Sequence, residues 1–316
     1  MNTMTHDTTR TAGLGFALAS AASFGLSGSL ARGLMDAGWS SAAAVSARIL
    51  LAAAVLAPVA IVQLRGRWEL LRRNAALVGT YGLLAVAGCQ LAFVNAVERM
   101  PVGVALLVEF MSPVAVIGWL WLNRGQRPGS RTLAGAVLAV AGLALVLDLL
   151  SGARVDGVGL VWAFGAMLGV TAYFLISARE VDGLPPTVLA AAGLTVGGFV
   201  LLLLGAVGVL PFAATRADVR FGGLTLAWWL PVLGLGVVTA ALAYVTGIAA
   251  TRRLGSRLAS FVALTELIAA LGFAWVLLGQ APRPVQLLGG GLVLVGVVIV
   301  KSGEPGRRSE RARPAH

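Results

Sequence analysis

Long apolar runs alternate with short polar segments along the whole chain, giving ten runs in all. A helix of about 20 apolar residues crosses the hydrocarbon core of a bilayer, which is about 30 Å thick. No run alternates polar and apolar residues as barrel strands do. The pattern therefore predicts an all-α polytopic membrane protein. The ten predicted transmembrane helices cover residues 12–31, 41–63, 75–96, 102–122, 132–150, 157–177, 187–210, 228–250, 258–278 and 285–300.

The polar segments at the ends and in one long loop carry signals of their own. One basic residue, Arg10, precedes the first apolar run, which we expect to stay as a helix and not to be cleaved as a signal peptide. Residues 211–227 mix arginines with phenylalanines and are expected to lie along the membrane interface. The tail after Lys301 is polar and Arg-rich, a composition typical of disorder.

The two halves of the sequence resemble each other. A shift of 154 residues places Gly125–Pro128, which reads GQRP, on Gly279–Pro282, which reads GQAP. Near the start the matching shift is 144, so the second half has ten additional residues between its first and third helices. At the shift of 154, further matches are Gly82 with Gly236, Ala96 with Ala250, Arg99 with Arg253, Gly118 with Gly272, Trp121 with Trp275, Gly135 with Gly289 and Gly142 with Gly296.

This repeat divides the chain into a first five-helix unit at 1–155, which includes a short N-terminal tail, a second at 156–301, and the basic tail 302–316. Because five is odd, the second unit is predicted to cross the membrane upside down relative to the first. Inverted repeats are typical of secondary transporters, whose substrate site lies near the midplane between the halves. Duplication without transport stays open as the alternative.

The charged residues predict an orientation. Only 12% of the residues are charged, against about 25% in soluble domains. With the N-terminus in the cytoplasm, the inner segments hold 17 Lys and Arg and the outer segments 6. This excess predicts cytoplasmic N- and C-termini in a multi-pass protein of a bacterial-type cytoplasmic (inner) membrane. The net charge of +11 is thus a topology signal, and no basic patch with stacking aromatics suggests nucleic-acid binding.

The apolar runs contain no histidine or lysine, residue types that catalysis or metal binding often uses. The histidines, His6 and His316, lie in the two tails, and Lys301 is the only lysine, so the chain has no P-loop. The single cysteine, Cys89, lies in an apolar run, where simple packing is expected. The sequence predicts neither an enzyme nor a metal site or cofactor.

Two charged residues, Arg48 and Glu109, lie at matching depths in their predicted helices. Each is about 10–12 Å below the outer surface at 1.5 Å per residue. They could hold a substrate carboxylate and an ammonium group or proton, or form a structural ion pair that neutralises two costly charges. Pro113, one turn after Glu109, is expected to kink the helix and free backbone carbonyls there.

A second acid, Glu266, occupies the equivalent helix of the second half, in LTELIAAL. No basic residue lies in the spans of that half, and a carboxyl that gains and loses a proton suits ion-coupled transport. The alternative is a permanently protonated side chain bonded to a neighbouring helix. Gln90 and Tyr244 occupy equivalent repeat positions and could line the same interior, as could Asn95, Tyr81 and Tyr173, or each could bridge helices by hydrogen bonds.

A family resemblance follows from these residues. The run YGLLAVAGCQLAFVNAVERMPVGVALLVEFMSPVAV at 81–116 resembles the third and fourth helices of EamA-type transporters of the drug/metabolite transporter superfamily, especially the threonine/homoserine exporter branch. SARILLAA around Arg48 resembles the second helix, and GQAPRPVQLLGGGLVLVGVVIV resembles the final loop and helix. The family commonly has Gly-Glu where this chain has Gln126 and Gln280, and a proline where it has Leu267, which puts a matching kink in doubt.

The resemblance implies export of amino acids or similar small polar metabolites, driven by proton exchange. We therefore expect an alternating-access transporter with a small-molecule substrate, the proton as coupling ion, and substrate or proton binding by Arg48, Glu109, Glu266, Gln90 and Tyr244. A homodimer stays open. The alternatives are a transporter of sugar-nucleotide or lipid-linked substrates and a membrane scaffold that transports nothing.

Overall fold

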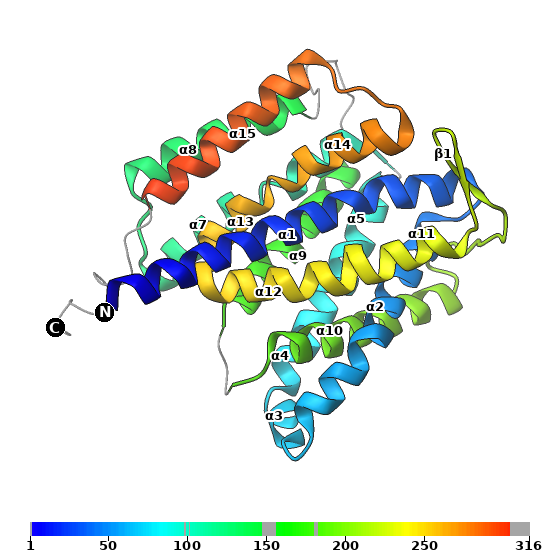
Figure 1. Ribbon diagram of the computed structural model, residues 1–316, viewed down its shortest axis with the longest axis horizontal. Coiled ribbons are helices and arrows are strands. Elements are labelled where there is room, and N and C mark those ends of the chain that lie inside the picture. Colours follow the sequence, from blue (N-terminus) through cyan, green and yellow to red (C-terminus); the bar gives the residue numbers. More distant parts are fainter. Residues whose placement is uncertain (1, 98, 101, 147–155, 180–182, 304–316) are drawn as a thin grey trace.

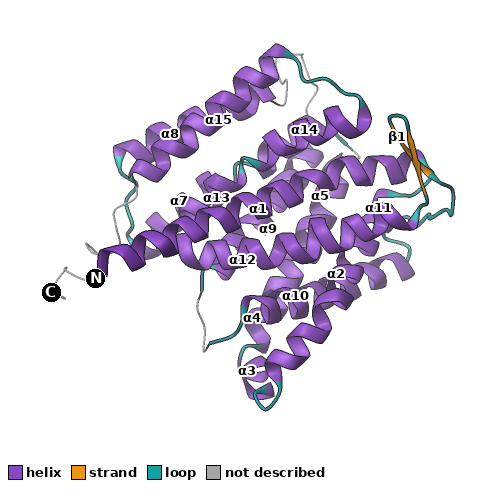
Figure 2. Cartoon of the chain, viewed as in Figure 1, coloured by secondary structure: helices purple, strands orange, loops and turns teal. Residues whose placement is uncertain are grey.

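The computed structural model describes residues 2–97, 99–100, 102–146, 156–179 and 183–303, with the side chains of 2–10, 97 and 102–103 outside the description. Helices form almost all of it (Figures 1 and 2). The elements are α1 Asn2–Asp36, α2 Ser41–Leu64, α3 Trp68–Arg73, α4 Ala75–Thr80, η1 Tyr81–Gly88, α5 Cys89–Val97, α6 Val102–Glu109, α7 Ser112–Arg124, α8 Ser130–Val146, α9 Gly157–Ser177, α10 Pro186–Ala206, β1 Val219–Phe221, β2 Leu224–Leu226, α11 Trp229–Leu233, η3 Gly234–Leu242, α12 Ala243–Leu254, α13 Ser256–Ala263, α14 Glu266–Leu278 and α15 Pro284–Gly303.

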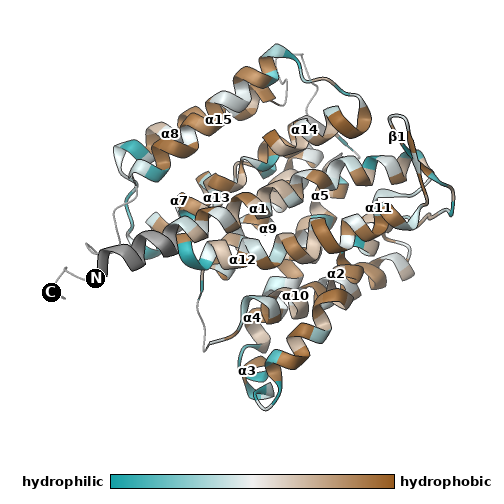
Figure 3. Cartoon of the chain, in the orientation of Figure 1, coloured by the Kyte–Doolittle hydropathy of each residue, from teal (hydrophilic) through white to brown (hydrophobic). Residues whose placement is uncertain are grey.

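Nine helical stretches among the described residues are long and apolar enough to cross a bilayer. Their bounds follow the sequence prediction closely; the predicted helix 75–96, for example, is observed as Ala75–Ala96. The apolar helix α8 has 17 residues and stops where the description stops. Apolar residues cover the helices and polar residues gather at their ends and in the loops (Figure 3). The prediction of an all-α polytopic membrane protein is confirmed at this level.

The terminal segments differ in part from the prediction. The first helix begins at Asn2, so residues expected to form a short tail continue α1. At the other end α15 extends to Gly303, and the tail expected to be disordered lies outside the described residues.

Two stretches of π-helix, η1 and η3, interrupt the spans Ala75–Ala96 and Trp229–Leu254. Sequence periodicity did not predict them. The repeat shift of 154 residues places η1, Tyr81–Gly88, on residues 235–242, which fall inside η3. π-Helical turns are rare and concentrate at functional sites. Their recurrence at equivalent positions therefore suggests that both spans contribute to a functional site.

The segment between α10 and α11, which was expected to lie along the membrane interface, contains a short β-hairpin. Val219 pairs with Leu226 and Phe221 with Leu224, leaving the two-residue turn Gly222–Gly223, with Gly222 at φ 55° as such turns require. Val219 and Phe221 are buried against Leu30, Leu34 and Leu235. The prediction of helices alone missed this hairpin, since three residues per strand are too few to give a period.

Hydrogen bonds fasten the same segment to the α1–α2 loop. The backbone N–H of Ser40 donates to Ala213 O at 2.8 Å, and the Ala213 N–H donates to Ser40 Oγ at 3.0 Å. Trp39 Nε1 donates to Thr215 O at 2.9 Å, and its ring stacks on Trp228 at 6.2 Å between centroids. The hairpin and these contacts close the end of the bundle opposite the start of α1 (Figure 1).

Helices α8 and α15 lie side by side at one edge of the bundle (Figure 1) and approach each other through glycines. A Cβ on Gly135 would lie 2.7 Å from Gly296 O, and a Cβ on Gly142 would lie 2.6 Å from Gly289 O. The contacts are reciprocal, and the order of the pairs shows that the two helices run antiparallel. Small residues at such interfaces let backbones pack closely within a membrane.

This packing gives a stability prediction. Gly289→Ala should lower the free energy of unfolding by about 1–3 kcal/mol, because its Cβ would meet a backbone oxygen that cannot move aside. Gly291→Ala, in the same helix, has no atom within 4 Å of the new Cβ and should be neutral or slightly stabilising. Thermal unfolding of both purified variants in detergent would check this, and equal melting temperatures would contradict it.

Candidate functional site

Two of the membrane-spanning helices are interrupted at equivalent positions. The first changes from α6 to α7 at Phe110–Met111, and the second from α13 to α14 at Leu264–Thr265. The repeat shift of 154 residues superposes the two interruptions. Glu109 is the last residue before the first interruption and Glu266 the first residue after the second. Each acid therefore lies where the helix geometry is irregular.

The two interruptions have different causes. Pro113, buried in the first turn of α7, has no N–H to donate to the carbonyl of Glu109. The second half has Leu267 at that position, which made a matching kink doubtful. The helix is nevertheless interrupted there as well. There the chain tightens, with the Thr265 N–H donating to Val262 O at 3.0 Å and the Thr265 hydroxyl donating to the same oxygen at 2.7 Å. Such back-bonding bends helices without proline.

Arg48 lies in the middle of α2 and is only 8% exposed. Its Nη2 donates to Thr239 O at 2.7 Å, a backbone oxygen in η3, and its guanidinium lies over the Phe24 ring, 5.4 Å from the centroid. Its Nε is buried without a hydrogen-bond partner among the described residues. The charge is thus partly satisfied by the backbone of the other half and keeps one donor available.

The Glu109 carboxyl is half-buried beside Cys89, whose thiol lies 3.7 Å from Glu109 Oε1. The same sulfur lies 3.6 Å from Ala166 O, so the single S–H can donate to either oxygen. The sequence predicts only packing for Cys89 and gives no sign of this contact. A cysteine 20 residues before an acid gives no local signal of contact.

Arg48, Glu109 and Glu266 interact electrostatically with one another inside the bundle. The structural ion pair considered for Arg48 and Glu109 is not formed, since the ion pairs among the described residues join Arg32 to Asp36 and Arg73 to Glu69. The reason is packing: α2 packs mainly on α10 and η3, whereas α6 packs on α5 and α9. The three charges face a common interior without neutralising one another by direct contact.

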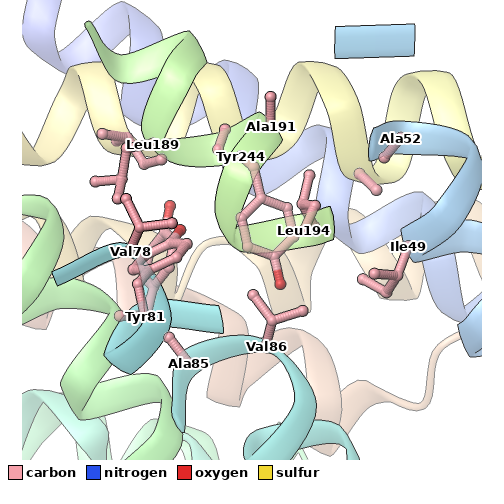
Figure 4. Close-up of a cluster of buried hydrophobic side chains, with 14 of the residues drawn as sticks. Ile49, Ala52, Val78, Tyr81, Ala85, Val86, Leu189, Ala191, Leu194 and Tyr244 are labelled. Carbon is pink, nitrogen blue, oxygen red and sulfur yellow. The ribbon is translucent and has the colours of Figure 1, made fainter. Parts of the chain in front are cut away.

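The three tyrosines form one aromatic cluster, in which Tyr244 adjoins Arg48 and Tyr173 adjoins Glu266. Tyr173 lies 6.0 Å from Tyr81 and 5.8 Å from Tyr244 between ring centroids, and Phe24 lies 5.3 Å from Tyr244. Figure 4 shows Tyr81 and Tyr244 among the buried side chains of α2, α4, η1 and α10. The Tyr173 hydroxyl has no hydrogen-bond partner in the described part of the chain, whereas the Tyr81 hydroxyl interacts with Ser177. Buried hydroxyls normally have a partner, so the Tyr173 hydroxyl is available to a polar ligand.

The structure also places the remaining predicted residues, Tyr244, Pro113 and Gln90. Tyr244 belongs to this cluster, and Pro113 shapes the helix that carries Glu109. Gln90, by contrast, lines a small apolar pocket with Ala42, Val45 and Leu201. Phe24 and Thr239 also contact Arg48 and were not predicted, because one is an ordinary apolar residue and the other contributes its backbone.

The fold and this interior define a multi-pass membrane protein with charged and polar groups enclosed in its helical bundle. The EamA-like transporter family matches residues 11–148 and again 157–302. The chain belongs to this family of membrane transporters.

Three curated relatives are similar over most of their length. One is a probable terminal-alkyne amino-acid exporter of Streptantibioticus cattleyicolor, 24% identical, with 77% of this chain and 78% of the relative covered. An uncharacterised inner membrane transporter of Salmonella typhimurium is 22% identical over 72% and 74%. An uncharacterised transporter of Archaeoglobus fulgidus is 26% identical over 72% and 77%. One crystal structure shares the fold, with a TM-score of 0.73 at 18% identity, covering 96% of this chain and 99% of that one.

The tyrosine cluster gives a second prediction. A Cβ on Gly247 would clash with the Tyr173 hydroxyl, so Gly247→Ala should lower the free energy of unfolding by about 1–3 kcal/mol. Tyr173→Phe removes the hydroxyl and should restore part of that loss, because Ser20 Oγ, 2.8 Å from the new Cβ, stays in place. The comparison is thermal unfolding of the two single variants and the double variant, with Gly272→Ala, which has open space around its Cβ, as control. An equal loss with and without the hydroxyl would refute the assignment.

Proposed function

We propose that this membrane transporter exports small polar metabolites, amino acids in the first place, by proton-coupled alternating access between two inverted halves. The observation that carries the proposal is the enclosed group of Arg48, Glu109 and Glu266, contributed by both halves and set beside two interrupted helices. Interrupted helices lining a charged interior are a recurrent construction of secondary transporters. The name of the Streptantibioticus relative adds support for amino-acid export.

We take the halves to be residues 1–155 and 156–301, with ten transmembrane helices in all, the fifth being the helix predicted at 132–150, of which α8 is the described part. Two family matches on one chain support the duplication. The reciprocal glycine contacts support inversion: Gly135 meets Gly296, the equivalent of Gly142, and Gly142 meets Gly289, the equivalent of Gly135. A two-fold axis in the membrane plane produces this crosswise pattern between antiparallel helices.

The side on which the termini lie follows from the basic residues. Inner segments hold 17 Lys and Arg and outer segments 6 when both termini are cytoplasmic. On this orientation the hairpin end faces outward, and the bundle is closed on that side. The protein would reside in the cytoplasmic membrane, as the name of the Salmonella relative states for that protein.

In this proposal Arg48 binds the substrate carboxylate through its unpartnered Nε, since a guanidinium matches a carboxylate in shape and charge. Glu109 and Glu266 each bind either a proton or the ammonium group of the substrate, one cation at a time, so that a proton takes the place of the substrate that leaves. Tyr173, Tyr81 and Tyr244 offer hydroxyls to the polar part of the substrate. Gln90, the repeat equivalent of Tyr244, stays in this proposal as a candidate without an assigned contact. Larger sugar-nucleotide or lipid-linked substrates, and a scaffold without transport, are the outcomes that the following tests would reveal.

The acids are tested by efflux. Cells loaded with labelled threonine, homoserine or a terminal-alkyne amino acid should export one or more of them through the wild-type protein. Glu109→Gln and Glu266→Gln should each reduce efflux to that of cells without the protein, because an amide cannot exchange a proton. Glu69→Gln, in an exposed pair with Arg73, is the matched control and should keep wild-type efflux. Full activity of both acid variants at normal expression would sink the coupling proposal.

Alternating access requires the hairpin end to open. Ser40 and Ala213 exchange hydrogen bonds across that closure, so Ser40→Cys with Ala213→Cys should form a disulfide on oxidation. The locked protein should lose efflux and regain it with reductant. Arg220→Cys with Thr225→Cys, paired within the hairpin, provides the matched control because its disulfide joins the hairpin only to itself. Undiminished efflux in the first, fully oxidised pair would contradict opening at this end.

A further inference from the structure

A pocket of about 360 Å³ opens between α7, α9 and α13. Its lining residues come from the C-terminal ends of α7 and α9 and from the first residue of α13. The proposed orientation places all three helix ends on the cytoplasmic side. The residues are Trp119, Leu120, Arg124, Leu175, Ala178, Arg179 and Ser256. The volume lies within the range of pockets for small molecules.

The polar lining of this pocket is cationic. Arg124 and Arg179 are exposed, and among the described residues neither has an acidic partner or a side-chain hydrogen bond. Ser256 is only 7% exposed, yet its hydroxyl makes no hydrogen bond in the described part of the chain. Ser256 also begins α13 after Gly255, at φ 82°, so the unpaired N–H groups of that first turn lie at the same place.

This set of groups matches an anion. Two guanidinium groups bind carboxylate or phosphate oxygens by paired, charge-assisted hydrogen bonds, and a helix start adds backbone donors and a partial positive charge. The hydroxyl of Ser256, which lines the pocket, can donate as well. Trp119, Leu120 and Leu175 give the pocket apolar walls that would hold the uncharged part of a small organic anion.

The position of the pocket connects it to the charged interior. Its lining helices α7 and α13 belong to the two interrupted spans, in which Glu109 and Glu266 flank the interruptions. The third, α9, carries Tyr173 less than one turn before Leu175. A molecule held in the pocket would thus lie between the ends of the helices whose middle parts form the enclosed site.

We propose that this pocket is the cytoplasmic vestibule of the transport path, where Arg124, Arg179 and Ser256 capture the carboxylate or phosphate group of a soluble substrate before it moves inward. This inference rests on the proposed transport function. Phospholipid headgroups share the phosphate chemistry, and the experiment separates the two sources.

The experiment follows alkylation of a cysteine placed in the pocket. Ala178→Cys, purified in phosphatidylcholine nanodiscs, is labelled with a neutral maleimide in the presence of increasing acetate or inorganic phosphate, with chloride keeping the ionic strength constant. Cys89 is buried and should react little with the maleimide. The wild type, which has Cys89 alone, gives the background labelling. Bound anion should slow the labelling of the Ala178→Cys variant, and the effect should saturate as the anion concentration rises.

Arginine variants in the same background then assign the effect. Arg124→Gln and Arg179→Gln should each raise the anion concentration for half-protection about tenfold, the change expected when a charge-assisted hydrogen bond is lost. Arg127→Gln is the matched control, an arginine three residues beyond Arg124 that does not line the pocket. Protection that is absent, or that persists unchanged in the Arg124→Gln, Arg179→Gln double variant, would overturn the proposal.

Lipid composition and transport kinetics provide two further measurements. Nanodiscs containing phosphatidylglycerol should label at the same rate as phosphatidylcholine nanodiscs; slowing by the lipid alone, without an effect of soluble anions, would assign the pocket to headgroups and overturn the substrate vestibule. In the efflux assay the double variant should raise KM with little change in kcat. Anion protection without efflux by the wild type would count against the transport function and not the binding site, whereas efflux without protection would count against the vestibule alone.

Discussion

A guanidinium in the middle of an apolar helix must find oxygen atoms inside the protein, because the bilayer supplies none. Arg48 finds one on the backbone of the opposite half, at Thr239 in η3. This bond ties α2 to η3 and brings the charge into the interior shared by the halves. Charges are tolerated within membrane-spanning segments only when they face such an interior. Glu109, Glu266 and the tyrosines can act together with Arg48 only because this contact holds its charge in that interior.

Irregular backbone recurs wherever the interior is polar. The π-helical segments η1 and η3 and the interruptions of α6–α7 and α13–α14 occupy equivalent places in the two halves. Non-helical backbone within a membrane persists only where protein or a polar cavity covers it. That two unrelated local causes, Pro113 in one half and Thr265 in the other, produce the same interruption indicates that the geometry matters more than the residue that creates it.

The two ends of the bundle differ in this conformation. At one end the hairpin and the α1–α2 loop are joined by hydrogen bonds and buried apolar residues. At the other, a basic pocket opens between the ends of α7, α9 and α13. The hairpin lies where the predicted repeat gives the second half ten additional residues, so the two sides of the bundle differ.

The sequence by itself determined the membrane-spanning helices and the family, and it predicted a repeat and the charged residues of the interior. These follow from runs of about 20 apolar residues, from a constant shift, and from the high cost of Arg48, Glu109 and Glu266 in apolar spans. Only the tertiary structure decided which helices are neighbours, and with them the absence of a direct Arg48–Glu109 ion pair and the contact of Cys89 with Glu109. The physical reason is that apolar periodicity reports burial, while helix packing and backbone acceptors such as Thr239 O leave no trace in one chain's residue types.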